Sequence, residues 1–233
     1  MRLLGTKTSL AAFRWDLIYL SAQLVSDERP GVSELAPPVQ ALLTQADAER
    51  AAYEQAEDAV IVAGALVDKK DSRRDKVLIA AGGVARASDP EVYTRLFPRL
   101  NPSGTARLGV AAESTQIGRI LGELAKLPAD SALRLSYEKP LTDAEALLKT
   151  ASKQSDQAAT SFALQRSQLE RFKLELDQQR LVTHGRLLVL LKSKAEADAF
   201  FRPTTTPPGE PVTKNPQAPQ SPQAPSVPPA NGG

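Results

Sequence analysis

The sequence predicts an all-α fold: an elongated antiparallel helical bundle of four or five main helices, followed by a disordered tail. Residues 141–201 contain no proline and one glycine, Gly185. They are expected to form one very long helix, about 90 Å at about 1.5 Å per residue. Alanine, leucine, glutamine and charged residues dominate the chain, which is typical of helical bundles. Residues 1–202 are therefore assigned to the helical domain and residues 203–233 to the tail.

The first expected helix covers residues 9–26, because apolar side chains recur there at helical spacing. These side chains are Leu10, Phe13, Leu17, Leu20 and Leu24. Aromatic residues lie off this stripe, which indicates a helix that neighbouring elements or a partner cover on more than one side.

A second helix is expected over residues 37–68. Its segment 59–67 is apolar on nearly every side, which predicts a central position. The charged segment 68–76 is interpreted as a turn before a third helix over residues 73–87. An unbroken helix through that segment is the alternative interpretation.

Two further helices are expected before the long one. Asp89-Pro90-Glu91 has the residues typical of a helix start. The next helix should cover residues 105–127 and contains Gly118 and Gly122 on one face, which predicts either close packing of another helix or local flexibility. Residues 129–140 are interpreted as a connector.

The long helix over residues 141–201 should begin with a capping box, Thr142 with Glu145 three residues later. Its apolar positions alternate at three and four residues, but alanine, serine and glutamine weaken the seam. We therefore expect other helices of a bundle to cover it. Residues 187–191 are apolar on every side, and either neighbours or a second copy of the chain should enclose them.

Composition argues against several classes of function. The 29 basic and 27 acidic side chains give a net charge of +2, which predicts no nucleic-acid partner. There is no cysteine, and the longest apolar run, Ala59–Val67, is too short to cross a membrane. The N-terminus lacks the apolar run of a signal peptide. The expected location is the cytoplasm, with a bacterial or phage assembly as one option there.

No pattern in the sequence indicates catalysis or a cofactor. The one histidine, His184, lies beside the apolar seam and has no glutamate three residues before it, as bundle metal sites require. Catalytic residues, metal ligands and cofactors are all predicted to be absent. Glu54, Glu57 and Asp58 are interpreted as a solvated acidic surface, with Glu54 the first candidate if a metal were bound.

Two segments are candidates for binding a partner. Basic residues gather in segment 68–76, where five of them are offset by three acids; the candidates are Lys69, Lys70, Arg73 and Arg74. A solvated turn is the favoured interpretation and an anion-binding surface the alternative. The tail repeats proline every third residue, at Pro216, Pro219, Pro222 and Pro225. This spacing suits polyproline recognition, although a flexible tether is favoured.

The sequence thus predicts a non-enzymatic structural or scaffolding protein, a subunit of a larger assembly whose partners are proteins and include other copies of itself. The alternative is a regulatory or chaperone-like module that binds a peptide in a groove between helices. A carboxylate-based metal enzyme is the third hypothesis, which metal analysis would test.

Overall fold

The computed structural model describes residue 1 and residues 3–202. The predicted tail, with its candidate prolines, lies outside the described residues. In chain order the elements are α1 (Leu10–Ser26), the 3₁₀ turn η1 (Ser33–Leu35), α2 (Ala36–Ser88), α3 (Pro90–Leu96), α4 (Pro102–Thr105), α5 (Val110–Ala125), α6 (Ala132–Leu191) and α7 (Lys194–Ala199). The prediction of an all-α fold is confirmed.

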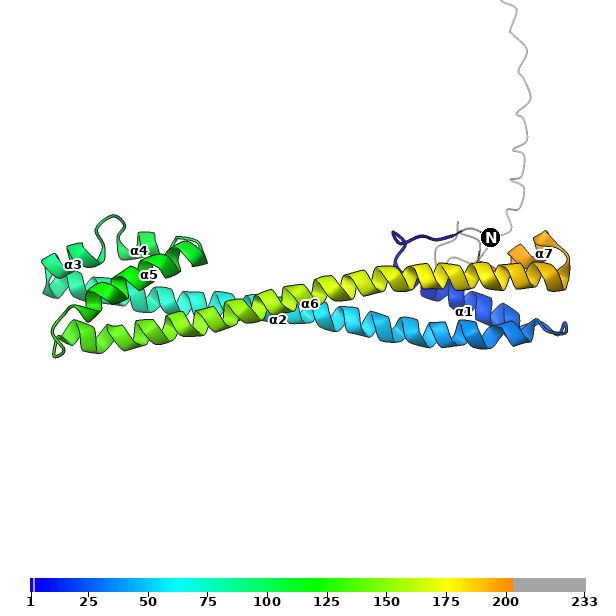
Figure 1. Ribbon diagram of the computed structural model, residues 1–233, viewed down its shortest axis with the longest axis horizontal. Coiled ribbons are helices and arrows are strands. Elements are labelled where there is room, and N and C mark those ends of the chain that lie inside the picture. The colour runs from blue at the N-terminus through cyan, green and yellow to red at the C-terminus, as the bar shows by residue number, and fades with distance from the viewer. Residues whose placement is uncertain (2, 203–233) are drawn as a thin grey trace, which may run out of the picture.

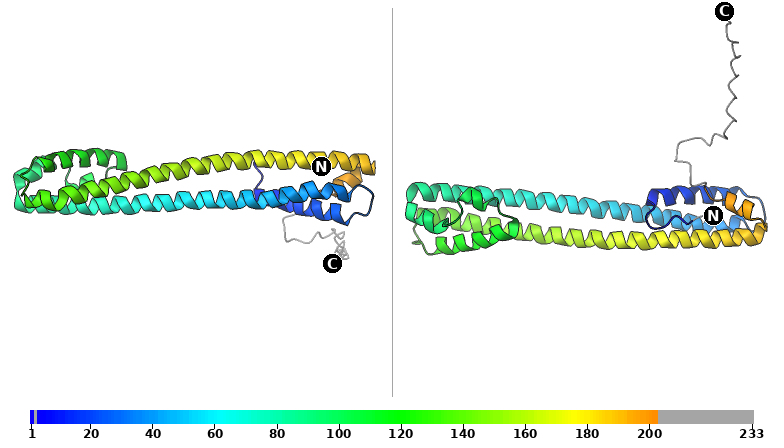
Figure 2. Two further views of the ribbon diagram at one scale, coloured as in Figure 1. Left: turned by 60° about the horizontal axis from the view of Figure 1, so that its bottom comes forward. Right: turned by 90° about the horizontal axis from the view of Figure 1, so that it is seen from above.

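Two long helices set the shape of the molecule. The 53 residues of α2 and the 60 residues of α6 run antiparallel and lie side by side (Figure 1). The shorter helices gather at the two ends of this pair, α1 and α7 at one end and α3, α4 and α5 at the other (Figure 2). We call these the α1 end and the α5 end. None of the helices in the described part of the chain is both long and apolar enough to span a membrane.

The α1 end has a hydrophobic core of its own. The predicted stripe of α1 is confirmed, since Phe13, Leu17, Leu20 and Leu24 are fully buried there. They pack with side chains of α6, including Phe172, Leu176 and Leu187, and with Phe200 and Phe201 after α7. Because α7 folds back from the end of α6, it closes this core from the side.

The α5 end has a second, separate core. Leu78 of α2, Ile117, Ile120 and Leu124 of α5, and Leu141 of α6 are all fully buried in it. The helix start predicted at Asp89 is confirmed, because its side chain accepts hydrogen bonds from the backbone N–H groups of Glu91 and Val92. Gly82 is required by packing, since a Cβ there would lie 2.1 Å from Cγ of Pro102 in α4.

Between the two ends, α2 and α6 pair only with each other among the described residues (Figure 1). We call residues 51–70 of α2 and 152–169 of α6, which include no member of either core, the middle section. The rings of Tyr53 and Phe162 meet across the pair with their centroids 5.2 Å apart. The predicted central position of segment 59–67 is wrong, since Ile61 is 65% exposed and Val62 is 60% exposed. Here a single helix covers the α6 seam, where the sequence had indicated a bundle.

The segment 68–76 is helical, so the predicted turn is wrong and the alternative of an unbroken helix is correct. The physical reason is that the segment holds no glycine or proline and that Arg74 is fully buried between helices. Its guanidinium contacts the Asp71 carboxylate at 2.6 Å, an i,i+3 pair that only a helix would place so well.

The boundaries of the long helix also differ from the prediction. The helix α6 is continuous, but it begins at Ala132 and holds Pro140 at an exposed position. The predicted capping box is wrong, because the Thr142 hydroxyl donates to the Glu138 carbonyl within the helix. At the other end, Lys192 takes a left-handed backbone conformation (φ 53°), and the helix stops ten residues before the predicted end.

The predicted close approach at Gly118 and Gly122 is also wrong. A Cβ added at either glycine would meet no atom within 4 Å. These glycines therefore lie on an open face of α5, and packing does not explain their presence.

Candidate functional site

The structure separates the basic residues that the sequence grouped together. Lys69 and Arg73 are exposed on the outer surface of α2 and Lys70 is partly exposed, and with Ser72 and Lys76 these three line a shallow groove of about 280 Å³. Arg74 points the other way and is fully buried. The basic groove therefore lacks Arg74, and the surface offered to a partner is smaller than the sequence indicated.

Arg74 joins three helices at the α5 end. Its Nη2 lies 2.6 Å from Oδ1 of Asp71 and 2.7 Å from Oε2 of Glu113 in α5. Its Nη1 lies 3.0 Å from Oε2 of Glu145 in α6 and donates to Oγ of Ser114 at 3.0 Å. We call Asp71, Arg74, Asp75, Glu113 and Glu145 the Arg74 cluster. Three carboxyl groups contact this guanidinium, and the fourth, that of Asp75, lies beside Asp71 and Glu113. Even with Lys149 3.5 Å from Glu145, the cluster holds an excess of negative charge in a largely buried region.

Burial shifts the pKa values of the carboxyl groups in this cluster. Burial, and after it a hydrogen bond with Asp75, raise the pKa of Glu113 to about 7, although the nearby Arg74 charge opposes this rise. Burial alone would raise the pKa of Glu145 too, but hydrogen bonds from Arg74 and Ser114 hold that pKa below its ordinary value. Glu113 is thus the member of the cluster that holds a proton near neutral pH.

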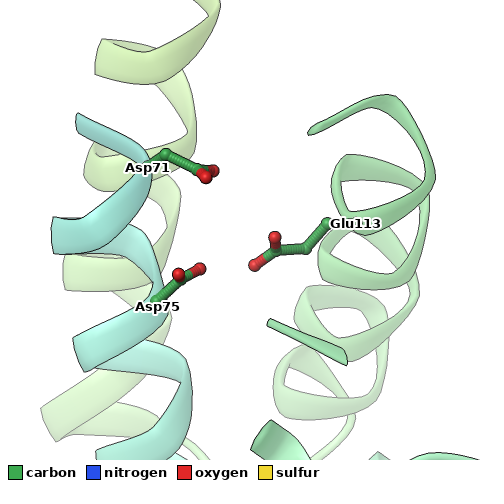
Figure 3. Close-up of side chains that lie close together, drawn as sticks. All are labelled: Asp71, Asp75 and Glu113. Atoms are coloured by element: carbon green, nitrogen blue, oxygen red, sulfur yellow. The ribbon is translucent and has the colours of Figure 1, made fainter. Parts of the chain in front are cut away.

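Three of these carboxylates have the geometry of a possible cation site. Asp71, Asp75 and Glu113 point toward one another (Figure 3), and one oxygen of each lies within 4.8 Å of the others. Carboxylate oxygens are the ligands that Mg²⁺ and Mn²⁺ prefer. However, the Arg74 guanidinium already contacts Asp71 and Glu113 and would repel a cation. The residues present fit a proton-carrying ion network better than a metal site.

The sequence analysis named a different acid as the first metal candidate. Glu54 is exposed, pairs with Arg50 at 2.8 Å on the same helix, and is not a member of the Asp71, Asp75 and Glu113 group. One signal in the sequence could have indicated the Arg74 cluster. Glu113 precedes Ile117, Ile120 and Leu124 on one apolar stripe of α5, and an acid on such a stripe requires a buried partner.

A second buried ion network lies at the α1 end. Arg180 of α6 contacts Asp16 of α1 at 2.5 Å and Asp177 at 2.6 Å, and all three side chains are nearly inaccessible to solvent. Asp177 also accepts hydrogen bonds from the backbone N–H groups of Leu4 and Gly5. Burial raises the pKa of Asp16, and Arg180 opposes that rise. We call Asp16, Asp177 and Arg180 the Arg180 cluster.

His184 links α6 to α7. Its Nε2 lies 2.8 Å from Oδ1 of Asp198, which also contacts the N-terminal amine of Met1. Hydrogen bonds from that amine and from His184 lower the pKa of Asp198. The position of His184 is partly buried, and its contacts hold the chain end and α7 against α6, as a structural residue would.

In the described part of the chain, apolar side chains are exposed at several places on the long helices, and two of these places concern the predictions above. One is the outward side of α2 in the middle section, around Ile61 and Val62. The other is a groove of about 480 Å³ at the α1 end, between the η1 region and the last turns of α6. It is lined by Gly31, Glu34, Leu35, Val182, Gly185, Arg186, Val189 and Leu190. Within residues 187–191, Leu187 is buried in the core of the α1 end, whereas Val189 is 75% exposed, so the described part of this chain encloses only one side of the segment.

In comparisons with known proteins, no family model matches this chain, and no curated protein or solved structure matches it significantly. Any functional assignment therefore depends on the geometry described above.

Proposed function

We propose that this protein is a non-enzymatic structural or scaffolding protein, a subunit of a larger assembly in which the α2–α6 pair holds two binding ends at a fixed distance. The observation that carries the proposal is the pairing of two long helices between two separate hydrophobic cores. Glu145 and Arg180 belong to the buried ion networks of the two ends. They are far apart along α6, about 50 Å at about 1.5 Å per residue.

The two ion clusters support a role that needs fixed geometry. Each one connects helices through a fully buried arginine, and a buried charge that loses its partner destabilises a fold by about 3–5 kcal/mol. Sliding α2 against α6 by one turn would separate Arg74 from Glu145. The clusters therefore favour one register of the two long helices, and with it one length of the rod.

The experiment that tests the proposal places a photo-reactive benzophenone amino acid at each end in turn. Leu135 at the α5 end is 67% exposed and Val189 at the α1 end is 75% exposed. Gln157, an exposed position of the middle section, is the matched control. After irradiation in the native cell, we expect cross-links to protein components from both ends, at constant stoichiometry, and few or none from Gln157.

The native complex should also be larger than the isolated protein when both are measured by light scattering. A native species no larger than the isolated protein, with no cross-link from either end, would overturn the scaffold proposal.

The alternative function, a regulatory or chaperone-like module, is favoured by the apolar groove at the α1 end. Val182, Val189 and Leu190 would contact apolar side chains of a bound peptide, and the absent side chain of Gly185 leaves room for its backbone. Stoichiometry separates the two functions. A chaperone-like module would cross-link from Val189 to transient partners, whereas Leu135 would give no cross-link.

A further inference from the structure

In the middle section no described element covers the outward side of α2 (Figure 2), and exposed apolar side chains form the centre of this side. Ile61, Val62 and Leu66 are 65%, 60% and 37% exposed, and Ala65 between them is also exposed. Four adjacent apolar side chains on a free helix surface are typical of a protein contact rather than of a solvated face. We call this surface, with the charges that flank it from Glu54 to Arg73, the α2 face.

The charges that flank the apolar centre have opposite signs on its two sides. Toward the N-terminus of α2 lie Glu54, Glu57 and Asp58, and toward the C-terminus lie Lys69, Lys70 and Arg73. Of these six residues only Glu54 forms an ion pair within the described part of the chain. Exposed Asp68 also lies in the C-terminal half, so the α2 face is acidic in one half and basic on balance in the other.

We infer that the occupant of the α2 face is a second copy of this chain, with the two α2 helices antiparallel about a two-fold axis between Ala63 and Gly64. In this alignment Val62 lies at the level of the partner subunit's Ala65, and Asp58 lies at the level of the partner subunit's Lys69. Positions 58, 62, 65 and 69 share one side of the helix at three- and four-residue spacing. Each contact occurs twice, as two-fold symmetry requires.

Charge complementarity selects this occupant. The same antiparallel alignment brings Glu54 level with the partner subunit's Arg73, so the acidic half of each copy faces the basic half of the other. A parallel alignment would instead bring Asp58 next to Asp58 of the partner subunit. A polyanion such as nucleic acid would meet the acidic half and be repelled. From Glu54 to Arg73 the face extends about 30 Å, enough for a long helix–helix contact.

The inferred dimer is compatible with the rest of the fold. Side chains of α2 that face α6, such as Ala63, lie on the opposite side of the helix from Val62 and Ala65. Two copies would thus form a four-helix middle section with the α2 helices inside and the α6 helices outside. The inference deepens the proposed scaffold function by naming one partner. Its test uses the isolated protein and is separate from the cross-linking test in the cell.

The first experiment measures the mass of the full chain by sedimentation equilibrium. We expect twice the chain mass of 25.0 kDa and a dissociation constant that rises with salt, because exposed ion pairs are screened. V62E should raise the dissociation constant at least about tenfold. L164E is the matched control, since Leu164 is 61% exposed on α6 in the same section, away from the α2 face. Equal effects of V62E and L164E, or a monomer at every concentration, would overturn the inference.

The second experiment tests the antiparallel register. D58K and K69D should each weaken the dimer, and the double variant D58K/K69D should restore it, because each charge pair is then reversed as a whole. Since the chain has no cysteine, single cysteines can be introduced to test the register by disulfide formation. A mixture of D58C and K69C proteins should form a disulfide between chains. D58C alone should not, because the sulfur atoms of its two copies would lie about 16 Å apart along the helix axis. A disulfide in D58C alone would contradict the antiparallel arrangement.

Discussion

Arg74 Nη2 lies 2.7 Å from Glu113 Oε2, and both side chains are completely inaccessible to solvent. The two residues belong to different helices, α2 and α5, and lie 39 positions apart in the sequence. This contact is the centre of the network that fastens the α5 end to the long helices, and the first two predictions concern it.

The pKa of Glu113 predicts how stability depends on pH. Its folded-state pKa is raised from 4.5 to about 7, so the folded protein keeps a proton that the unfolded chain releases. The free energy of unfolding should therefore fall by roughly 2–3 kcal/mol between about pH 4.5 and about pH 7. In E113Q, whose amide cannot ionise, most of this fall should disappear in denaturant titrations at each pH. A smaller fall will remain because burial also raises the pKa values of Asp71 and Asp16. Identical pH profiles for the two proteins would contradict the assignment.

Removing the buried guanidinium should be far more harmful than removing its exposed neighbour. We expect R74A to lower the free energy of unfolding by about 3–5 kcal/mol, because three carboxyl groups lose their cation. R73A is the control one position away; at a protein concentration low enough to dissociate the inferred dimer, its exposed side chain should contribute less than about 0.5 kcal/mol. Urea unfolding followed by circular dichroism measures both. Comparable losses would show that Arg74 is not the cation of the network.

Adjacent glycines of α2 should respond in opposite ways to alanine. In G82A the new Cβ would lie 2.1 Å from Cγ and 2.9 Å from Cβ of Pro102, so α4 must shift and the melting temperature should fall. In G83A the new Cβ meets nothing within 4 Å, and helix propensity should stabilise the protein by about 0.5–1 kcal/mol. Differential scanning calorimetry of the two variants checks both signs.

Divalent cations should not stabilise the protein. Arg74 already neutralises part of the Asp71, Asp75 and Glu113 group, so Mg²⁺ or Mn²⁺ should leave the melting temperature unchanged. R74Q provides the comparison, since it removes the competing charge and keeps a polar side chain. A clear rise of the melting temperature of the unmodified protein with Mn²⁺ would instead support the metal hypothesis.

The sequence was sufficient for features that depend on local patterns. The stripe of α1 and the cap at Asp89 follow from spacing and residue type, and both were correctly predicted. The boundaries of the long helices were not predictable in the same way. Pro140 is a normal helix breaker, yet α6 continues through it because Leu133 and Leu141, on either side, are buried in one core.

Most of the candidate site could not be predicted from the sequence. The partners of Arg74 on other helices, Glu113 and Glu145, are 39 and 71 positions away along the chain, and no periodicity connects them. The mixed charges of segment 68–76 are compatible both with an exposed turn and with a helix in which one arginine, Arg74, is buried. The apolar segment 59–67 was misread for a related reason. An apolar segment predicts a covered position, but within the described part of this chain Ile61 and Val62 stay exposed.

The seam of the middle section has a consequence for how such a protein could change its span. Because α2 and α6 are antiparallel there and meet through a repeating three- and four-residue pattern, seven residues could be added to or removed from both helices together. The distance between the ends would change by about 10 Å, while their relative rotation would change by only about 20°. Insertions or deletions of whole heptads in both helices would therefore change the distance between the two ends while nearly keeping their relative orientation.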